Sequence, residues 1–330
     1  MTRGLFIRAD AGPQLGTGHV MRMLALAEAW VERGGEVTFG GQVTPALLER
    51  ITALGARFVE LKSVDVESVI TQARTAGASV MVADGYSYDL AFQRTIRAAG
   101  LRLMVVDDNG ENAAYDADWV LNVNVHAAAT MYPGRVGQAL LGPSYALLRS
   151  QLRRATARAR GPVVERVLLT MGGADPVDAT GRLLHVLQGQ AWGLSVLVGA
   201  ANPRLAAYEA ARRPGTELHF NVTDVTTVMS KADLAVAAAG GTVWELALLG
   251  VPSLVVSLAD NQAVLARTLG ELGAAAYLGD ARATTDLATW AAQVDELVRD
   301  EARRSRLVQT ARSLVDGKGA LRVVDALWET

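Results

Sequence analysis

A chain of 330 residues is longer than one ordinary hydrophobic core accommodates, and this length predicts two domains of roughly 150 residues each. Half of the residues are hydrophobic, and the formal net charge of −2 gives no reason to expect nucleic acid or an anionic membrane as the main partner. The chain has no cysteine, which excludes disulfides, thiolate nucleophiles and cysteine-ligated zinc.

The remaining composition also argues against metal or membrane chemistry. The four histidines lack the spacing of metal ligands, so neither a metal nor another cofactor is expected. The N-terminus lacks the basic segment and apolar stretch of a signal peptide, and no apolar run is long enough to span a bilayer. These features predict a protein of the cytoplasm without a membrane span.

Residues 1–150 alternate between strand-like and helix-like segments. Strands are expected at residues 5–10, 36–40, 57–61, 79–84, 101–108 and 119–122, where the series closes. Helices are expected at residues 19–33, 45–54, 66–76 and 90–99. Such alternation predicts a parallel sheet with helices on both faces.

The glycine-rich stretch at residues 15–22 connects the first strand to the first helix. Gly16 and Gly18 let the backbone approach a ligand closely, and the free amides of a helix start attract anions. His19 lies at or near that start, where the helix dipole disfavours imidazolium, so a neutral general base is one interpretation. The other interpretation is that His19 only caps the helix. Arg22, one turn later, could reach a phosphate or form a surface salt bridge.

Polar residues lie at the ends of four of the predicted strands. They are Asp10, Asp84, Asp107 with Asp108, and Asn122 with Asn124. Because the carboxyl ends of parallel strands share one edge, these side chains are expected to converge with His19 and Tyr86 at a ligand site. The alternative for each acid is a cap on the next helix.

An arginine-rich segment at residues 149–160, ending at Gly161-Pro162, marks the predicted domain boundary. It divides the chain into a first domain at residues 1–150 and a second domain at 161–330. A nucleic-acid-binding arm is the alternative, but no aromatic residues interleave the arginines and the chain is not basic.

The second half repeats the alternation. Strands are expected at residues 163–171, 194–198, 218–220, 233–237, 251–257 and 274–278. Helices are expected at 179–188, 203–212, 226–231 and 260–272, and from residue 287 onward the tail is predicted to be helical throughout. The last helix is a candidate to pack back on the first domain.

A second candidate site lies between a strand and a helix of this half. Gly240, Gly241 and Thr242 offer backbone amides and a helix start to a phosphate, and Glu245 follows one turn later, where it could accept both hydroxyls of a ribose. Further candidate ligand contacts are Gly172, Gly173, Asn261 and Gln262. The alternative is a plain turn with Glu245 in a salt bridge. GxGxxG after the first strand and GxxxxGK[ST] are both missing, which disfavours NAD and ATP.

The order of these features resembles a known group of proteins. Two α/β halves with the run at residues 240–262 resemble the GT-B nucleotide-sugar fold, two Rossmann-like domains with a cleft between them, of the family that includes the peptidoglycan N-acetylglucosaminyltransferase. The motif at residues 8–10 and 16–22 is more similar to the UDP-2,4-diacetamido-2,4,6-trideoxy-β-L-altropyranose hydrolase family of pseudaminic acid biosynthesis. Residues 145–149 and 171–175 fit the same pattern.

This resemblance implies an inverting hydrolase that releases UDP from the anomeric carbon of a diacetamido sugar. It implies that His19 is the general base for water, that Tyr86 lies near the sugar, and that Glu245 binds the ribose of UDP. Asp10 is a candidate to orient the water. Gly85 departs from the family pattern, which has histidine there, and this bears on which sugar substituents are contacted.

Two other functions remain open at this point. One is a GT-B glycosyltransferase that uses a UDP-sugar donor in cell-surface polysaccharide synthesis, and the other is a non-catalytic protein that binds UDP-sugars. Related spore-coat polysaccharide proteins carry a similar motif. The expected partner is a UDP-sugar, and the sequence predicts no oligomeric state.

Overall fold

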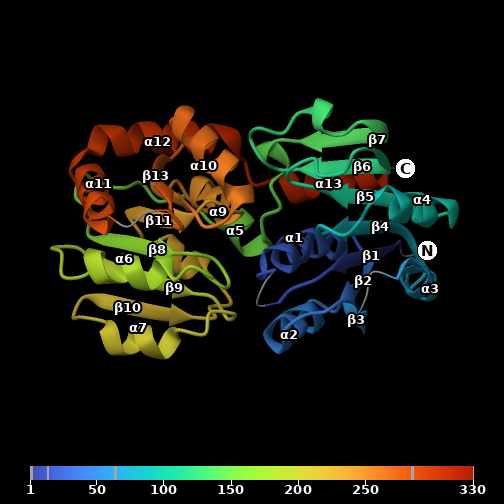
Figure 1. The fold of residues 1–330 in the computed structure, drawn as a ribbon, viewed down its shortest axis with the longest axis horizontal. Helices are drawn as coiled ribbons and strands as arrows, with labels where there is room; N and C mark the ends of the chain where they lie inside the picture. The colour runs from blue at the N-terminus through green and yellow to red at the C-terminus, as the bar shows by residue number, and fades with distance from the viewer. Residues whose placement is uncertain (1–2, 13–14, 63–64, 284–285, 330) are drawn as a thin grey trace. The chain divides into compact units, whose positions relative to one another are not determined.

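The computed structural model describes every residue except 1–2, 13–14, 63–64, 284–285 and 330. The chain divides into two compact units, the first comprising residues 1–150 and 317–330 and the second residues 151–316. Each unit is built around one parallel sheet (Figure 1). No helix within the described ranges is long and apolar enough to cross a membrane.

The first unit contains a seven-stranded sheet in its described part, with the strand order β3-β2-β1-β4-β5-β6-β7. The strands are β1 (Gly4–Ala9), β2 (Glu36–Gly41), β3 (Arg57–Glu60), β4 (Ala78–Asp84), β5 (Arg102–Val106), β6 (Tyr115–Asn122) and β7 (Gly134–Leu141). The connecting helices are α1 (Gly18–Glu32), α2 (Pro45–Ala53), α3 (Val66–Thr75) and α4 (Leu90–Ala98).

The central strands are apolar because helices cover both faces of this sheet. In β4, five successive residues from Val80 to Asp84 are buried, which explains the nearly continuous apolar run in the sequence. Met81 packs with Ile70 of α3 and Ile96 of α4 in one core cluster. The sequence therefore folds as predicted here, with strands and helices in the expected order.

The edge of this sheet differs from the prediction. Strand β6 begins at Tyr115 rather than 119, and β7, a parallel edge strand, was not predicted. Both differences arise because these segments carry polar or exposed residues. Asp116 and Asp118 alternate with buried residues and pair with Arg97 of α4, while most of β7 is not buried. A strand with one exposed face and one free edge lacks the apolar pattern that reveals a buried strand.

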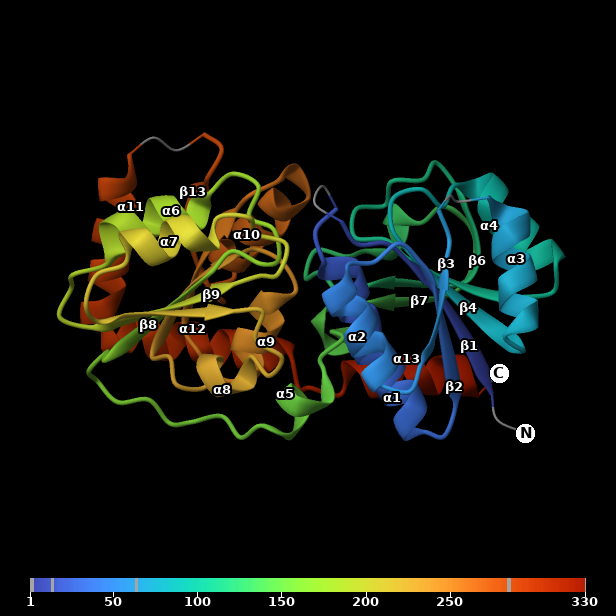
Figure 2. The same ribbon diagram turned by 90° about the horizontal axis from the view of Figure 1, so that it is seen from below.

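The C-terminal helix α13 (Gly319–Trp328) belongs to the first unit. Figure 2 shows α13, in red, running beside α1. The rings of Trp30 and Trp328 lie 4.7 Å apart, and the guanidinium groups of Arg3 and Arg33 lie over the Trp328 ring. Apolar and cation–π contacts together attach the end of the chain to its first helix.

The second unit contains a six-stranded parallel sheet in its described part, in the order β10-β9-β8-β11-β12-β13. Its strands are β8 (Arg166–Thr170), β9 (Gly193–Val198), β10 (Thr216–Phe220), β11 (Leu234–Ala238), β12 (Ser253–Ser257) and β13 (Ala276–Asp280). Its helices are α5 (Ser150–Arg154, reached from the first unit), α6 (Ala179–Leu187), α7 (Leu205–Ala211), α8 (Thr226–Met229), α9 (Thr242–Leu248), α10 (Asp260–Glu271), α11 (Leu287–Arg299) and α12 (Glu301–Leu314).

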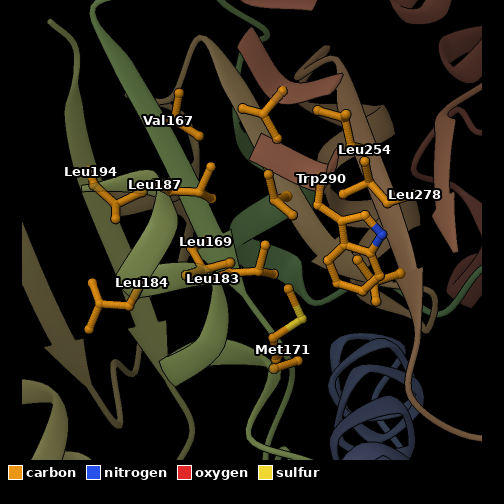
Figure 3. Close-up of a cluster of buried hydrophobic side chains, with 14 of the residues drawn as sticks. Val167, Leu169, Met171, Leu183, Leu184, Leu187, Leu194, Leu254, Leu278 and Trp290 are labelled. Carbon is orange, nitrogen blue, oxygen red and sulfur yellow. The ribbon is translucent and has the colours of Figure 1, made fainter. Parts of the chain in front are cut away.

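The core of the second unit lies between its sheet and the helices α6 and α11. Figure 3 shows Leu169 and Met171 at the end of β8 close to Leu183 of α6, with Trp290 of α11 in the same cluster. These side chains are almost wholly buried. Burying such a cluster is the main favourable contribution to the stability of the unit.

The sequence predicts a tail that is helical throughout from residue 287 onward. In the structure this tail is instead divided into three helices, α11, α12 and α13. Asp300 ends α11, and its carboxylate accepts a hydrogen bond from the amide of Arg303 at 2.8 Å, which caps α12. Gly317, with φ of +78°, lies in the break between α12 and α13. A glycine in this conformation ends the helical path at little steric cost.

Candidate active site

The candidate site of the first unit lies where its strand order reverses. The chain leaves β1 toward β2 on one side, and β4 returns to pair with β1 on the other side. In open parallel sheets, ligands bind outside the carboxyl ends of the strands at this switch point. The first turn of α1 and the last residue of β4, Asp84, both lie there.

Gly12 and Gly16 belong to the loop between β1 and α1. The backbones of Gly12 and Gly16 are joined by two hydrogen bonds of 2.7 and 3.1 Å, and Gly16 has a φ of +74° that favours glycine. Helix α1 begins at Gly18, so His19 is its second residue, as the sequence predicted. The loop therefore delivers His19 to the carboxyl edge of the sheet.

His19 and Asp84 form a hydrogen-bonded pair. Nδ1 of His19 lies 2.7 Å from Oδ1 of Asp84, whose side chain is wholly buried. Burial by itself would raise the pKa of Asp84, but the charge of Arg22 and the hydrogen bonds from Arg22 and His19 together hold that pKa well below its ordinary value. The carboxylate is therefore ionised and can only accept, so Nδ1 carries the proton in this pair. In the neutral imidazole, Nε2 is then left with its lone pair.

Arg22 joins this pair to a second carboxylate. Its Nε and Nη2 donate to the two oxygens of Asp84, each at 2.6 Å, and its Nη1 donates to Asp108 at 2.7 and 3.0 Å. Two-pronged contacts of this kind are among the stronger hydrogen bonds in proteins. The sequence left Arg22 open as a phosphate contact or a surface salt bridge, and the structure gives it a partly buried network of two carboxylates.

A polar pocket opens beside this network. Its lining comprises His19, Arg22, Gly85, Tyr86, Val105, Val106, Asp107, Asp108, Glu111 and Asn112. The ring of Tyr86 stands edge-on to the His19 ring, with the centroids 5.1 Å apart, and the side chain remains 49% exposed. Tyr86 is thus well placed to contact a ligand that reaches His19.

Asp107 lines the pocket but also holds the loop after β5. Its carboxylate accepts hydrogen bonds from the amides of Asn109, Gly110 and Glu111. The hydroxyl of Tyr115 donates to the same carboxylate. These contacts fix the loop that brings Glu111 and Asn112 to the pocket, two residues that sequence reasoning missed because nothing in the sequence reveals the path of a loop.

Asn122 lies beneath the pocket rather than in its lining. Its side chain is fully buried and donates to the backbone oxygen of Asp108 at 3.0 Å and to the hydroxyl of Tyr132 at 2.7 Å. Its Oδ1 accepts from the amide of Asn124. Asn122 therefore holds the backbone of Asp108, which lines the pocket, and the substrate contact assigned to it from the sequence stays a prediction.

Asp10 lies outside the lining of this pocket. Its carboxylate pairs with the buried guanidinium of Arg8 at 2.6 Å and accepts a hydrogen bond from the amide of Gln42 at 2.8 Å. The carboxylate that contacts His19 is that of Asp84, on the neighbouring strand. The water-orienting role expected of Asp10 stays a prediction, while its recorded contacts hold β1 and the end of β2 together.

The glycine loops of the second unit also lie at the point where the strand order reverses, because β8 and β11 are neighbours. Gly172 and Gly173 follow β8, and Gly240 and Gly241 follow β11. A side chain on either Gly240 or Gly241 would meet no neighbouring atom within 4 Å, so both backbones face open space. The structure thus brings the two predicted glycine loops to one edge of this sheet.

The other predicted contacts of this unit lie in the first turns of two helices. Thr242 begins α9, and Glu245 lies one turn later on the same helix. Asn261 and Gln262 belong to the first turn of α10. The Oε1 of Gln262 accepts a hydrogen bond from the amide of Leu258 at 2.9 Å, so this oxygen is used within the fold.

Comparison with known sequences finds a family model that matches the second half of the chain and relatives that match most of its length. Residues 208–316 match the glycosyltransferase family 28 C-terminal domain. The chain is 25% identical to the spore coat polysaccharide biosynthesis protein SpsG of Bacillus subtilis, over 98% of this chain and 97% of that protein. It is 23% identical to the UDP-2,4-diacetamido-2,4,6-trideoxy-β-L-altropyranose hydrolase of Campylobacter jejuni, over 82% of this chain and 97% of that protein.

Solved structures define the fold class. The chain superimposes on MurG of Acinetobacter baumannii with a TM-score of 0.68 and 15% identity, covering 99% of this chain and 100% of that one. The protein therefore has the GT-B fold, as predicted from the sequence. Together with the sequence relatives, this fold supports an enzyme that is glycosyltransferase-like and related to proteins of polysaccharide and UDP-sugar metabolism.

Proposed function

We propose that this protein hydrolyses a UDP-linked 2,4-diacetamido-2,4,6-trideoxy sugar at the anomeric carbon, releasing UDP and the free sugar. Such a sugar is a precursor of pseudaminic acid, a nonulosonic acid. The observation that carries the proposal is the His19–Asp84 pair, which leaves Nε2 of His19 as a base beside an open polar pocket.

The chemistry assigned to this pair is activation of water. Nε2 of His19 takes a proton from water while the water oxygen bonds to the anomeric carbon and the bond from that carbon to the UDP oxygen breaks. Asp84 stabilises the imidazolium that forms and keeps the ring in the Nδ1-protonated tautomer. A single attack from the face opposite to UDP inverts the anomeric centre. A positioned base of this kind contributes typically about 10²–10⁴-fold to the rate.

The second unit is the proposed binding site for UDP. This assignment is supported by the family 28 match over residues 208–316, which includes Gly240, Gly241, Thr242 and Glu245, and also Asn261 and Gln262. The backbone amides of Gly241 and Thr242 would contact the diphosphate, and the carboxylate of Glu245 would accept the ribose hydroxyls. UDP departs as a stable anion, so hydrogen bonds to its phosphates are expected to help the reaction.

The polar pocket of the first unit is the proposed sugar site. Tyr86 offers an exposed aromatic face, which suits the apolar face and methyl group of a 6-deoxy sugar. Glu111 and Asn112 offer an acceptor and an amide for acetamido groups. These contacts are supported by the lining of the pocket and by the likeness to the Campylobacter hydrolase.

A glycosyltransferase with a UDP-sugar donor is the second candidate. The family 28 match and the likeness to MurG favour it. In that reaction His19 would deprotonate an acceptor hydroxyl instead of water. The two functions differ in one measurable respect, which is whether the release of UDP requires an acceptor.

The deciding experiment incubates the full chain with a panel of UDP- and CMP-linked deoxy amino sugars in the absence of any acceptor. We expect UDP to be released stoichiometrically with free sugar from a UDP-diacetamido sugar, and nuclear magnetic resonance to show the inverted anomer first. Release of UDP only after an acceptor is added would identify a transferase. Tight binding without turnover would leave a non-catalytic UDP-sugar-binding protein.

A further inference from the structure

The hydrogen-bonding groups of Arg22 are committed to protein carboxylates. Nε, Nη1 and Nη2 all donate to Asp84 or Asp108, at 2.6 to 3.0 Å. A phosphate that used the same guanidinium fork would have to displace one of these carboxylates, and the wholly buried Asp84 would then lose its main counter-charge. A direct role in binding UDP is therefore not the use that this geometry favours.

We propose that Arg22 is a positioning residue that keeps the His19 imidazole in its neutral, Nδ1-protonated form, with Asp108 as the second anchor of the guanidinium. This inference rests on the function proposed above, in which Nε2 of His19 is the base. In this inference Arg22 sets the protonation state of His19 and does not contact the substrate.

The first step of the argument concerns the tautomer. Asp84 is held by Arg22 as an ionised acceptor, so Nδ1 of His19, at 2.7 Å, must present a hydrogen to it. A protonated Asp84 would instead be able to donate to Nδ1 and move the ring proton to Nε2. The charge of Arg22 thus selects the tautomer in which Nε2 can accept a proton from water.

The second step concerns the charge of the ring. Nη2 of Arg22 lies 3.3 Å from Nδ1 of His19, so its positive charge opposes the formation of imidazolium at close range. Without Arg22, the Asp84 carboxylate at 2.7 Å would face His19 with no guanidinium beside it, and it would draw a proton onto the ring. An imidazolium has no lone pair at Nε2 and cannot act as the base.

Other charged and titratable groups around His19 are already paired or more distant. Asp107 is held by three backbone amides and the Tyr115 hydroxyl, and Glu111 accepts from Asn109 at 2.9 Å. Arg8 and Asp10 of β1 pair with each other. The remaining groups that face this region are Tyr86, Tyr88 and His126. Arg22 is thus the cation paired both with Asp84, the carboxylate that contacts His19, and with Asp108.

The test follows the four histidine side chains by nuclear magnetic resonance as pH is varied, without substrate. The His19 signals are assigned with His19→Asn, and the variants are Arg22→Gln, Arg22→Lys and Asp108→Asn. In Arg22→Gln we expect the midpoint of the His19 titration to rise by at least about one pH unit, which is a tenfold gain in proton affinity. The midpoint of the acid limb of the pH–rate profile should move to higher pH by the same amount.

The charge-conserving variant and the opposite charge change complete the test. Arg22→Lys should return the midpoint most of the way to that of the wild type, and Asp108→Asn should lower it, because a negative charge is removed. If Arg22→Gln does not fold, Asp108→Asn still decides the matter, because it is expected to move the midpoint away from that of the wild type. A His19 titration that none of them moves, with KM for the UDP-sugar raised instead, would overturn the inference and restore Arg22 as a ligand contact.

Failure of the proposed function would look different. If the wild type released UDP from no sugar on the panel but the His19 titration moved as expected, the hydrolase proposal would be wrong and the electrostatic inference would stand. If the wild type hydrolysed a UDP-sugar but the titration did not move, the inference would be wrong and the function would stand.

Discussion

His19 and Asp84 are 65 positions apart in the chain, yet Nδ1 of His19 lies 2.7 Å from Oδ1 of Asp84. The contact exists because β4 pairs with β1, so the end of β4 meets the helix that follows β1. A carboxylate on Nδ1 of an imidazole fixes the tautomer that leaves Nε2 available as a base. Four predictions follow from this pair and from the fold that supports it.

The first prediction concerns the base. His19→Asn retains an amide donor toward Asp84 but removes Nε2, so we expect kcat to fall by about 10²–10⁴-fold while the affinity for UDP is unchanged. Steady-state kinetics and calorimetric titration with UDP measure the two quantities. The control is His185→Asn, on an exposed position of α6, which should retain wild-type kcat. Equal activity in both variants would exclude His19 as the base.

The second prediction concerns acid stability. The pKa of Asp84 is lower in the folded protein than its usual value of 3.8. Burial alone would raise this pKa, but the charge of Arg22 and the hydrogen bonds from Arg22 and His19 together outweigh burial. A carboxyl with a depressed folded pKa stabilises the fold above its unfolded pKa, and this contribution is lost as pH falls. Asp84→Asn should cost roughly 3–5 kcal/mol at pH 7, because it leaves Arg22 partly unpaired.

The same reasoning predicts how that cost varies with pH. The difference in urea midpoint between the wild type and Asp84→Asn should narrow steadily from about pH 5 to about pH 2. Glu49→Gln, on an exposed position of α2, serves as the control and should show no such trend. A cost that stays constant over this range would mean that Asp84 is not ionised in the native protein.

The third prediction concerns the C-terminal helix. Leu327 is fully buried on α13, whereas Leu321 on the same helix is 38% exposed. Leu327→Ala should therefore reduce the free energy of unfolding by about 2–5 kcal/mol, since it leaves a cavity in the core. Leu321→Ala should change it by less than about 0.5 kcal/mol. Urea unfolding monitored by tryptophan fluorescence measures both, and similar losses would show that α13 is not anchored through its buried face.

The fourth prediction concerns the proposed UDP site. Glu245→Ala should weaken UDP binding by at least roughly 10- to 100-fold, because even a single hydrogen bond to a charged acceptor contributes about 1.5–3 kcal/mol. The matched control is Glu271→Ala, an exposed glutamate of α10 in the same unit. The His19 titration in the first unit should be the same in both variants. Unchanged UDP affinity in Glu245→Ala would move the ribose contact elsewhere.

Much of the fold follows from local pattern. The apolar run that became β4 and the glycine-rich start of α1 could be read directly, because a strand buried on both faces and a helix after a tight loop have characteristic sequences. Strand β7 could not be predicted from the sequence, because an edge strand needs few apolar residues. The break at Gly317 is not predictable from the local pattern, because an isolated glycine can be tolerated within a helix or can end it.

Local patterns in the sequence predict the two α/β halves, the position of His19 at the start of a helix and the polar residues at the ends of the strands. They do not predict which polar residues meet: Asp84 and not Asp10 contacts His19, Arg22 joins Asp84 to Asp108, and Asn122 holds the backbone of Asp108. Local pattern sets which segments form strands and helices, whereas contacts between distant side chains depend on the order of the strands in the sheet. That order is specified by packing across the whole unit.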